Sequence, residues 1–178
     1  MEYFTKMKGT TKSPPGVSLA EIAWSWAGAF IGISLVSIIN SYVFDGTDVT
    51  LVIGSFGASA VLVYGAIRSP LAQPRNFVGG HMLCALIGVA SYNALHAHLW
   101  LASSVAVATA LAVMHVTKTL HPPGGATALI AVIGGNSIHA MGYWYVLVPA
   151  GLGAVIMLIV ALLFNNLPKS RRYPMFWF

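Results

Sequence analysis

Acidic residues are scarce in this chain, and their scarcity narrows the functions it can perform. Only four of its 178 residues are Asp or Glu, and none of them lies after Asp48. Cation sites in membranes use carboxylates or rings of carbonyls, and the proton relays of pumps use Asp or Glu. Nucleophilic catalysis also usually depends on a carboxylate that orients a histidine. A cation pump and an enzyme are therefore poorly supported, and no catalytic residue is assigned.

Cysteine is almost absent as well. The single Cys84 excludes a disulfide framework. The sequence also lacks a tight pair of His or Cys residues at the spacing that metal ligands on a helix show. We therefore expect neither a metal site nor another cofactor.

Charged residues of either sign are rare, and apolar residues dominate. Hydrophobic residues make up 57% of the chain and charged residues 7%, with a mean hydropathy of +0.79. Soluble domains carry roughly 25% charged residues, so the chain is predicted to be an integral membrane protein with lipids around it. The net charge of +5 is then a topology signal and not a sign of a nucleic-acid partner, because the charges fall between apolar runs.

Six apolar runs predict an all-α membrane protein of about six membrane segments. They cover residues 22–44, 51–67, 77–95, 101–117, a run that contains 118–127 and fades at 134–139, and 143–164.

Glycine and proline break the second run at 54–57 and the fifth at 122–125. Similar hexapeptides, Gly57–Leu62 and Gly125–Ile130, lie in these middle runs of the two halves. The pattern predicts two inverted repeats of three segments, whose broken segments mark a binding site. The predicted transmembrane domain covers residues 21–166, between an N-terminal tail (1–20) and a basic, aromatic C-terminal tail (167–178).

The basic residues predict the membrane topology of the chain. If all six runs cross the membrane, every Lys and Arg lies on one face, and Asp45 and Asp48 lie on the other. Basic residues favour the cytoplasmic side, so both termini are expected in the cytoplasm. The first twenty residues contain neither an apolar signal sequence nor a long Ser/Arg-rich import sequence, which favours a bacterial inner membrane.

Each break leaves about eleven residues of helix, or roughly 16 Å, which is half of a bilayer. The two half-helices are expected to begin near the midplane and to direct their N-termini at one region. Helix N-termini bind anions through free N–H groups and the helix dipole. The predicted binding residues are the small and polar ones beside the breaks: Ser55, Gly57, Ser59, His121, Gly124, Gly125 and Thr127.

Other polar residues near these runs are candidates for the pathway of the anion, since ionisable groups at membrane depth are often functional. These candidates are Arg75, His81, His115, Lys118 and Thr119. Simpler explanations compete with these roles. Lys118 can serve as a topology charge, His121 as a helix cap, and the glycines as sites of close helix packing.

The sequence around the second break resembles a known family. Residues 121–129 read HPPGGATAL, which is similar to the signature that gives the HPP family of integral membrane proteins its name. Residues 57–60, 69–76 and 79–81 are similar to a second characteristic block of that family. The resemblance implies four membrane helices, where the charge pattern predicts six crossings. It also implies nitrite transport, with which plant and cyanobacterial members are associated.

The predicted function is the transport of a small inorganic anion, with nitrite as the substrate that the resemblance implies. Another cargo, such as nitrate or a weak-acid anion carried with a proton, is the first alternative. A membrane scaffold or partner subunit that transports nothing is the second. The sequence decides neither between a channel and a coupled carrier nor whether the chain forms a homo-oligomer.

Overall fold

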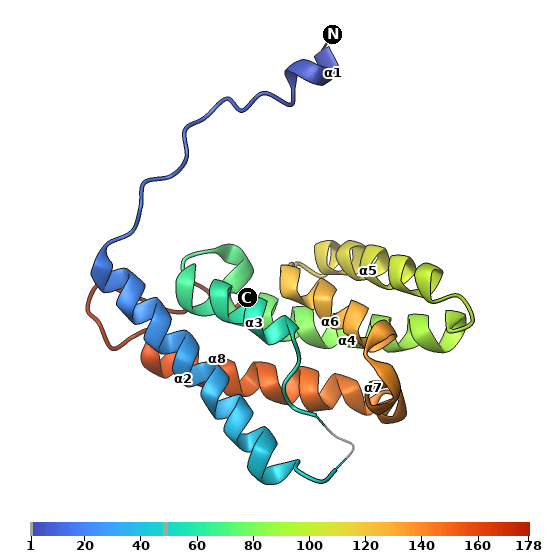
Figure 1. Ribbon diagram of the computed structural model, residues 1–178. Coiled ribbons are helices and arrows are strands. Elements are labelled where there is room, and N and C mark those ends of the chain that lie inside the picture. Colours follow the sequence, from blue (N-terminus) through green and yellow to red (C-terminus); the bar gives the residue numbers. More distant parts are fainter. Residues whose placement is uncertain (1, 48–49) are drawn as a thin grey trace.

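A computed structural model describes residues 2–47 and 50–178, and in these residues the regular structure is helical (Figure 1). The longer α-helices are α2 (Leu19–Val43), α4 (Pro74–Leu95), α5 (Leu99–Val116), α6 (Pro122–Ile133) and α8 (Leu152–Phe164). The short α-helices are α1 (Glu2–Thr5), α3 (Ser55–Ala60) and α7 (Gly135–Met141). Two π-helical segments, η1 (Val61–Gly65) and η3 (Val146–Gly151), and a 3₁₀ turn, η2 (Pro70–Ala72), complete the fold.

Four of the helical stretches are long and apolar enough to cross a membrane: Leu19–Val43, Pro74–Leu95, Leu99–Val116 and Val146–Phe164. Two shorter apolar helices, Ser55–Gly65 and Pro122–Ile133, coincide with the runs predicted to be broken. The all-α prediction is confirmed. Six segments of full length are not present in the described residues, and the four long helices agree with the number that the family resemblance implied. The relation of the two halves as inverted repeats stays a prediction.

Two helices, Ser55–Gly65 (α3 with η1) and Pro122–Ile133 (α6), are too short to cross a membrane, and local features of the chain explain where each begins. A non-helical stretch, residues 50–53, precedes α3, and the buried side chains of Leu51 and Ile53 anchor it in the core. The N–H of Leu51 donates to Oδ1 of Asn40 at 2.6 Å, which gives this irregular backbone a partner. Lys118, with φ of 56°, turns the chain before α6, and two prolines then occupy the first positions of that helix.

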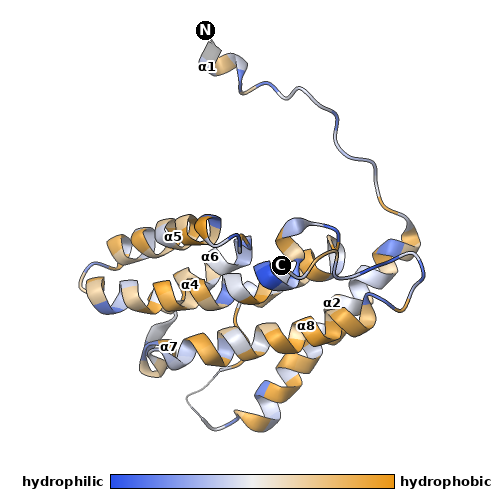
Figure 2. Cartoon of the chain, turned by 180° about the vertical axis from the view of Figure 1, so that it is seen from behind, coloured by the Kyte–Doolittle hydropathy of each residue, from blue (hydrophilic) through white to orange (hydrophobic). Residues whose placement is uncertain are grey.

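The helices pack in two groups (Figure 1). Helix α4 lies against α5 and α6, while α2, η1 and α8 pack together. Contacts of α4 with η3 and α8, and of α3 with α6, join the groups. Small residues permit the close approach of α5, because Ala102, Ala106 and Ala110 form a buried stripe on one face of that helix. The long helices consist mostly of apolar residues (Figure 2), and many of their large apolar side chains are exposed, as a lipid environment requires.

Two aromatic side chains fill the hollows that glycines leave. The ring of Tyr64 in η1 lies over Gly28 and Gly32 of α2, and the ring of Phe56 lies over Gly153 of α8. Tyr64 is fully buried, and its hydroxyl donates to the carbonyl oxygen of Met157 at 3.0 Å. A tyrosine one helical turn before an arginine is typical of a membrane interface, yet Tyr64 lies in the core because the glycines of α2 admit its ring.

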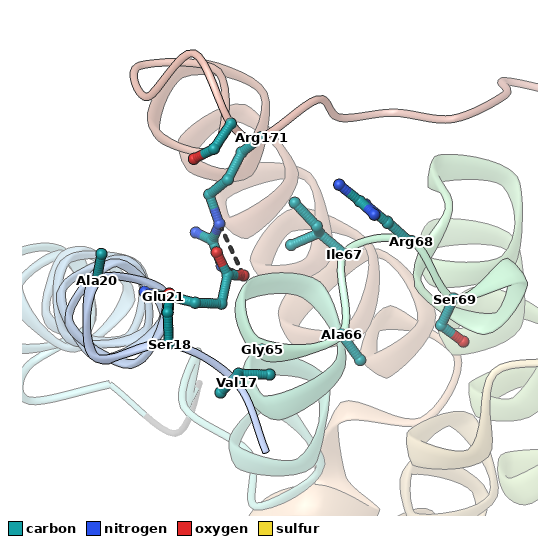
Figure 3. Close-up of a pocket in the computed structure, with 11 residues that line it drawn as sticks. Val17, Ser18, Ala20, Glu21, Gly65, Ala66, Ile67, Arg68, Ser69 and Arg171 are labelled. Atoms are coloured by element: carbon teal, nitrogen blue, oxygen red, sulfur yellow. Dashed lines mark hydrogen bonds and ion pairs between the residues drawn. The ribbon is translucent and has the colours of Figure 1, made fainter. Parts of the chain in front are cut away.

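The C-terminal segment folds back onto the bundle and is held by a partly buried ion pair. Nη2 of Arg171 lies 2.8 Å from a carboxylate oxygen of Glu21 (Figure 3). The same nitrogen also donates to the carbonyl oxygen of Tyr64. The hydroxyl of Tyr173 donates to the carbonyl oxygen of Ala72 at 2.7 Å. Burial raises the pKa of this phenol above its usual value. These contacts tie the chain end to the start of α2 and to the loop before α4.

The segments that carry most of the basic residues meet at one end of the bundle. A pocket of about 560 Å³ brings Ser18 and Glu21 beside Arg68 and Arg171 (Figure 3). The side chain of Arg75 donates to the carbonyl oxygen of Thr117, next to Lys118. The placement of these basic segments on one face of the membrane stays a prediction. Asp45 lies in the turn after α2, while Asp48, predicted for the opposite face, lies outside the described residues.

Candidate functional site: a buried polar chain

The N-terminal parts of α3 and α6 lie side by side. Oγ of Ser55, the first residue of α3, is 2.8 Å from Oγ1 of Thr127 in the second turn of α6. Oγ of Ser59, one turn further along α3, is 2.9 Å from Nε2 of His121, the N-cap of α6. Because the order of contacts reverses between the helices, α3 and α6 overlap in antiparallel directions. Four of the predicted binding residues are therefore brought together.

A histidine from a third helix connects these two contacts. Nδ1 of His81 in α4 lies 2.7 Å from Oγ1 of Thr127, and Nε2 of the same ring lies 2.7 Å from Oγ of Ser59. His81 is fully buried, with the rings of Phe56 and Phe77 edge-on against it. His81 was predicted only as a pathway candidate, yet it lies at the centre of the site.

His121 forms the other end of the site. Its Nδ1 lies 2.7 Å from the carbonyl oxygen of Leu71, in the loop before α4. Its backbone N–H donates to the sulfur of Met114 at 3.4 Å, and its ring packs against Phe77. A carbonyl oxygen only accepts hydrogen bonds, so Nδ1 of His121 is assigned as the nitrogen that carries a hydrogen.

Together these contacts form one unbranched series of side chains, which we call the polar chain. In order it consists of Ser55, Thr127, His81, Ser59 and His121, and it ends at the carbonyl oxygen of Leu71. All five side chains are buried. Within residues 2–47 and 50–178, every buried side-chain nitrogen or oxygen has a hydrogen-bond partner, so the polar chain is saturated in this conformation.

The backbone donors expected at the two helix starts are mostly occupied. Pro122 and Pro123 have no N–H, and the N–H of Gly124 donates to the carbonyl oxygen of His121 at 2.8 Å. In α3, the N–H groups of Phe56 and Gly57 also donate to preceding carbonyls. A ligand at this site would consequently meet hydroxyl and imidazole groups, in contrast to the backbone N–H cradle that the sequence predicted.

The predicted glycines divide into two kinds. A Cβ atom added to Gly57 or Gly125 would meet no other atom within 4 Å, so no close approach requires glycine there. A Cβ on Gly124 would lie 2.9 Å from the carbonyl oxygen of Gly80 and 2.9 Å from the sulfur of Cys84. Gly124 thus lets α6 cross closely over α4, and the packing explanation holds for it and for Gly80.

Three of the predicted pathway residues line a second pocket, which we call the vestibule. Its volume is about 480 Å³, and its basic side chains are Arg75, His115 and Lys118. Leu71, whose carbonyl receives the end of the polar chain, lines the same pocket, as do Phe176 and Phe178. Thr119 does not line it; its hydroxyl pairs with that of Thr117, and its methyl group faces Gly79.

Two contributors to the site were not predicted. Tyr145 is fully buried and donates to the carbonyl oxygen of Thr127 at 3.1 Å. The carbonyl group of Leu71 has no sequence signature, because any residue supplies a carbonyl. For Tyr145, Pro149 and Gly151 in the following η3 segment were the one available sequence sign of an irregular, inward-facing segment.

Comparison with known proteins identifies the family. The chain matches the family described as HPP, transmembrane region, over residues 14–174. Two transmembrane proteins of Dictyostelium discoideum are similar: one is 44% identical over 180 residues, covering 99% of this chain and 58% of the relative. The other is 42% identical over 182 residues, covering 99% of this chain and 64% of the relative.

The chain thus spans about three fifths of the length of these relatives. No solved structure gives a significant match. The apolar helices, the HPPGGATAL signature at the start of α6 and the family match over most of the chain lead to the same conclusion: this integral membrane protein belongs to the HPP transmembrane family.

Proposed function

We propose that this protein transports a small inorganic anion across the membrane, with the polar chain as its binding site. The observation that carries the proposal is a buried cluster of three hydroxyls and two imidazoles, built where two half-length helices overlap. No Asp or Glu occurs after Asp48, so no carboxylate from α3, α4 or α6 repels an anion at this site. Nitrite is the substrate that the family resemblance favours. Both termini are proposed to face the cytoplasm, as in a bacterial inner membrane, and an enzymatic role is not proposed.

The chemistry of the cluster suits a small oxyanion. Hydroxyl groups and protonated ring nitrogens donate hydrogen bonds, and each donor released from its internal partner can turn to an anion. The site is closed in this conformation, so an anion must replace bonds within the polar chain when it binds. Such replacement keeps binding weak enough for release, which a transporter requires.

The vestibule gives the proposed route a mouth on the basic face. Arg75, His115 and Lys118 surround it, and positive charge attracts anions into a pocket. Leu71 lines the vestibule and also contacts His121, so the pocket leads to one end of the polar chain. An anion drawn into the vestibule would therefore meet His121 first.

Flux measurements on the purified full chain in liposomes test the proposal. Nitrite uptake should exceed that of empty vesicles and should fall in the Thr127→Val variant, which keeps the shape of the side chain and removes its hydroxyl. Ser104→Ala is a matched control, because Ser104 is exposed on α5 and bonds only its own helix. Uptake of nitrate in place of nitrite would correct the substrate. If no small anion is transported, the scaffold alternative is favoured.

A further inference from the structure

The donors and acceptors of the polar chain can be assigned from its end at Leu71. Nδ1 of His121 carries a hydrogen, because it faces a carbonyl oxygen at 2.7 Å. If the ring is neutral, its Nε2 must accept, and Ser59 donates to it. The one hydrogen of Ser59 is then used, so Nε2–H of His81 donates to Ser59. Nδ1 of His81 accepts from Thr127. Thr127 is the donor of its 2.8 Å pair with Ser55 in this structure, so in the neutral order the hydroxyl of Ser55 must turn to donate to Thr127.

One additional proton reverses this order without moving a heavy atom. When Nε2 of His121 also carries a hydrogen, it donates to Ser59, and Ser59 donates to Nε2 of His81. Nδ1–H of His81 then donates to Thr127. Thr127 has two acceptors for its own hydrogen in this state: Oγ of Ser55 at 2.8 Å and the carbonyl oxygen of Pro123 at 3.2 Å. Both protonation states therefore leave every ring nitrogen of His81 and His121 with a hydrogen-bond partner.

We infer that the polar chain relays protons, so that each anion crosses the membrane together with one proton. A proton that reaches Oγ of Ser55 displaces the hydrogen of that hydroxyl to Thr127. Each member in turn passes on one hydrogen, and His121 becomes an imidazolium. The proton leaves from Nδ1 of His121 when the ring releases Leu71 and turns to the vestibule. One proton enters and one leaves. The hydroxyls then rotate back, and each imidazole regains its first tautomer by losing the hydrogen on one ring nitrogen and gaining one on the other while the site is open to water.

The surroundings limit the relay to one proton at a time. The rings of His81 and His121 lie 5.0 Å apart between centroids, so two imidazolium ions would repel each other strongly. The other titratable groups against the chain are Cys84 of α4, which packs on Gly124, and Tyr145 of η3, which donates to Thr127. The basic side chains Arg75, His115 and Lys118 line the vestibule, beyond the Leu71 end.

The coupling part of this inference rests on the proposed anion transport, whereas the relay itself does not. Full-length protein in liposomes that contain a pH-sensitive dye permits nitrite and proton uptake to be measured separately. We expect about one proton taken up with each nitrite ion, above the background that nitrous acid gives in empty vesicles. Nitrite uptake without proton uptake would overturn the relay and leave the proposed function intact. Proton uptake without transport of any anion would support the relay and refute the proposed function.

Variants of Ser59 separate a relay from a merely structural polar cluster. Ser59→Ala removes the hydroxyl that links the two rings, and proton uptake should fall by roughly tenfold or more, since both Nε2 atoms lose their partner. Ser59→Thr keeps a hydroxyl and should restore uptake. Ser91→Ala, which alters a buried serine of α4 outside the polar chain, is the matched control. Unchanged proton uptake by Ser59→Ala would overturn the inference.

Nitrogen NMR of the wild-type protein with ¹⁵N-labelled histidine gives a test that needs no variant to fold. At alkaline pH we expect a hydrogen on Nδ1 of His121 and on Nε2 of His81. On acidification, His121 should become doubly protonated while His81 exchanges its hydrogen from Nε2 to Nδ1 in the same titration step. If His81 keeps its tautomer while His121 gains a proton, the two rings are not linked through Ser59, and the relay is refuted.

Discussion

His81 and His121 share a single hydroxyl: Oγ of Ser59 lies 2.7 Å from Nε2 of the first ring and 2.9 Å from Nε2 of the second. The two histidines come from different helical segments, and neither ring could face the other without the break before α6. The N-cap position leaves His121 outside the regular helix, with φ of −141° and ψ of 99°. The irregular backbone thus aims a side chain at the core that a continuous helix would direct elsewhere.

His121→Ala should lower anion flux by roughly tenfold or more, because Ser59 and the carbonyl of Leu71 both lose a buried hydrogen-bond partner. Liposome flux assays on the monodisperse variant measure the effect. His96→Ala is the control, since His96 is exposed in the turn after α4. Normal flux in His121→Ala would reduce this histidine to a structural cap.

Two glycine substitutions in α6 should have unequal effects on stability. Gly124→Ala forces a Cβ within 2.9 Å of the backbone of α4 and should lower the free energy of unfolding by about 1–3 kcal/mol. Gly125→Ala meets no atom within 4 Å and should be neutral or stabilise the helix by up to about 1 kcal/mol. Unfolding in mild detergent, followed by circular dichroism, measures both. Equal destabilisation by the two substitutions would contradict the assigned packing role.

Loss of the ion pair between Arg171 and Glu21 should weaken the attachment of the C-terminal segment to the bundle. Only 1% of the Arg171 side chain is exposed, compared with 28% of Glu21. Glu21→Gln leaves the buried guanidinium without its counter-ion and should destabilise the protein by about 1–3 kcal/mol, below the cost of breaking a fully buried ion pair, because the Glu21 carboxylate is partly exposed. Arg172→Gln, an exposed neighbour, should change the melting temperature little. A Glu21→Gln variant with wild-type stability would show that the pair is screened by water.

The C-terminal segment should also be sensitive to alkaline pH. The hydroxyl of Tyr173 is buried and donates to Ala72, and burial raises the pKa of this phenol above the usual value of about 10. The folded state therefore holds this proton more tightly than the unfolded state does. The resulting stability is complete below pH ~10 and is lost as the pH rises toward the folded-state pKa.

Melting temperatures between pH 8 and pH 11 measure this loss. Tyr173→Phe should be less stable at neutral pH but should show a smaller decline above pH ~10. Tyr42→Phe serves as the comparison, because Tyr42 is 86% exposed. The assignment fails if the alkaline decline of Tyr173→Phe equals that of the wild type.

Cysteine labelling tests the predicted membrane topology. Cys84 is buried, so an impermeant maleimide should label the wild type little. Cysteines introduced at the exposed residues Lys118 and Arg172 should be protected in intact cells and labelled after lysis, because both residues are proposed to face the cytoplasm. A cysteine at His98, in the turn between α4 and α5, should be labelled from outside. Labelling of Lys118→Cys from outside would invert the proposed orientation.

Much of the helical framework was predictable because it depends on local chemistry. Ser18 caps α2 by accepting the N–H of Glu21, and Pro74 begins α4, as the ordinary preferences of helix starts predict. The Pro–Pro–Gly–Gly sequence placed the start of α6 near its observed position, since prolines at the first helical positions have no N–H to leave unpaired.

The tertiary arrangement could not be predicted in the same way. Whether His81 faces lipid or another helix depends on how α4 is rotated about its axis. No local sequence signal indicates that His81 contacts both Ser59 of α3 and Thr127 of α6. The roles of the glycines depended on packing too, because Gly124 contacts α4 whereas the adjacent Gly125 has open space.

The sequence by itself determined that this is a membrane protein, that two of its apolar runs are broken, and that hydroxyl and histidine residues lie beside the breaks. Those properties follow from composition and from the conformational limits of proline and glycine, which act within a few residues. Only the tertiary structure decided that Ser59 joins His81 to His121 and that the end of this chain is a carbonyl beside the vestibule. Contacts between distant segments depend on how the helices rotate and cross, and side-chain packing across the whole bundle sets those angles.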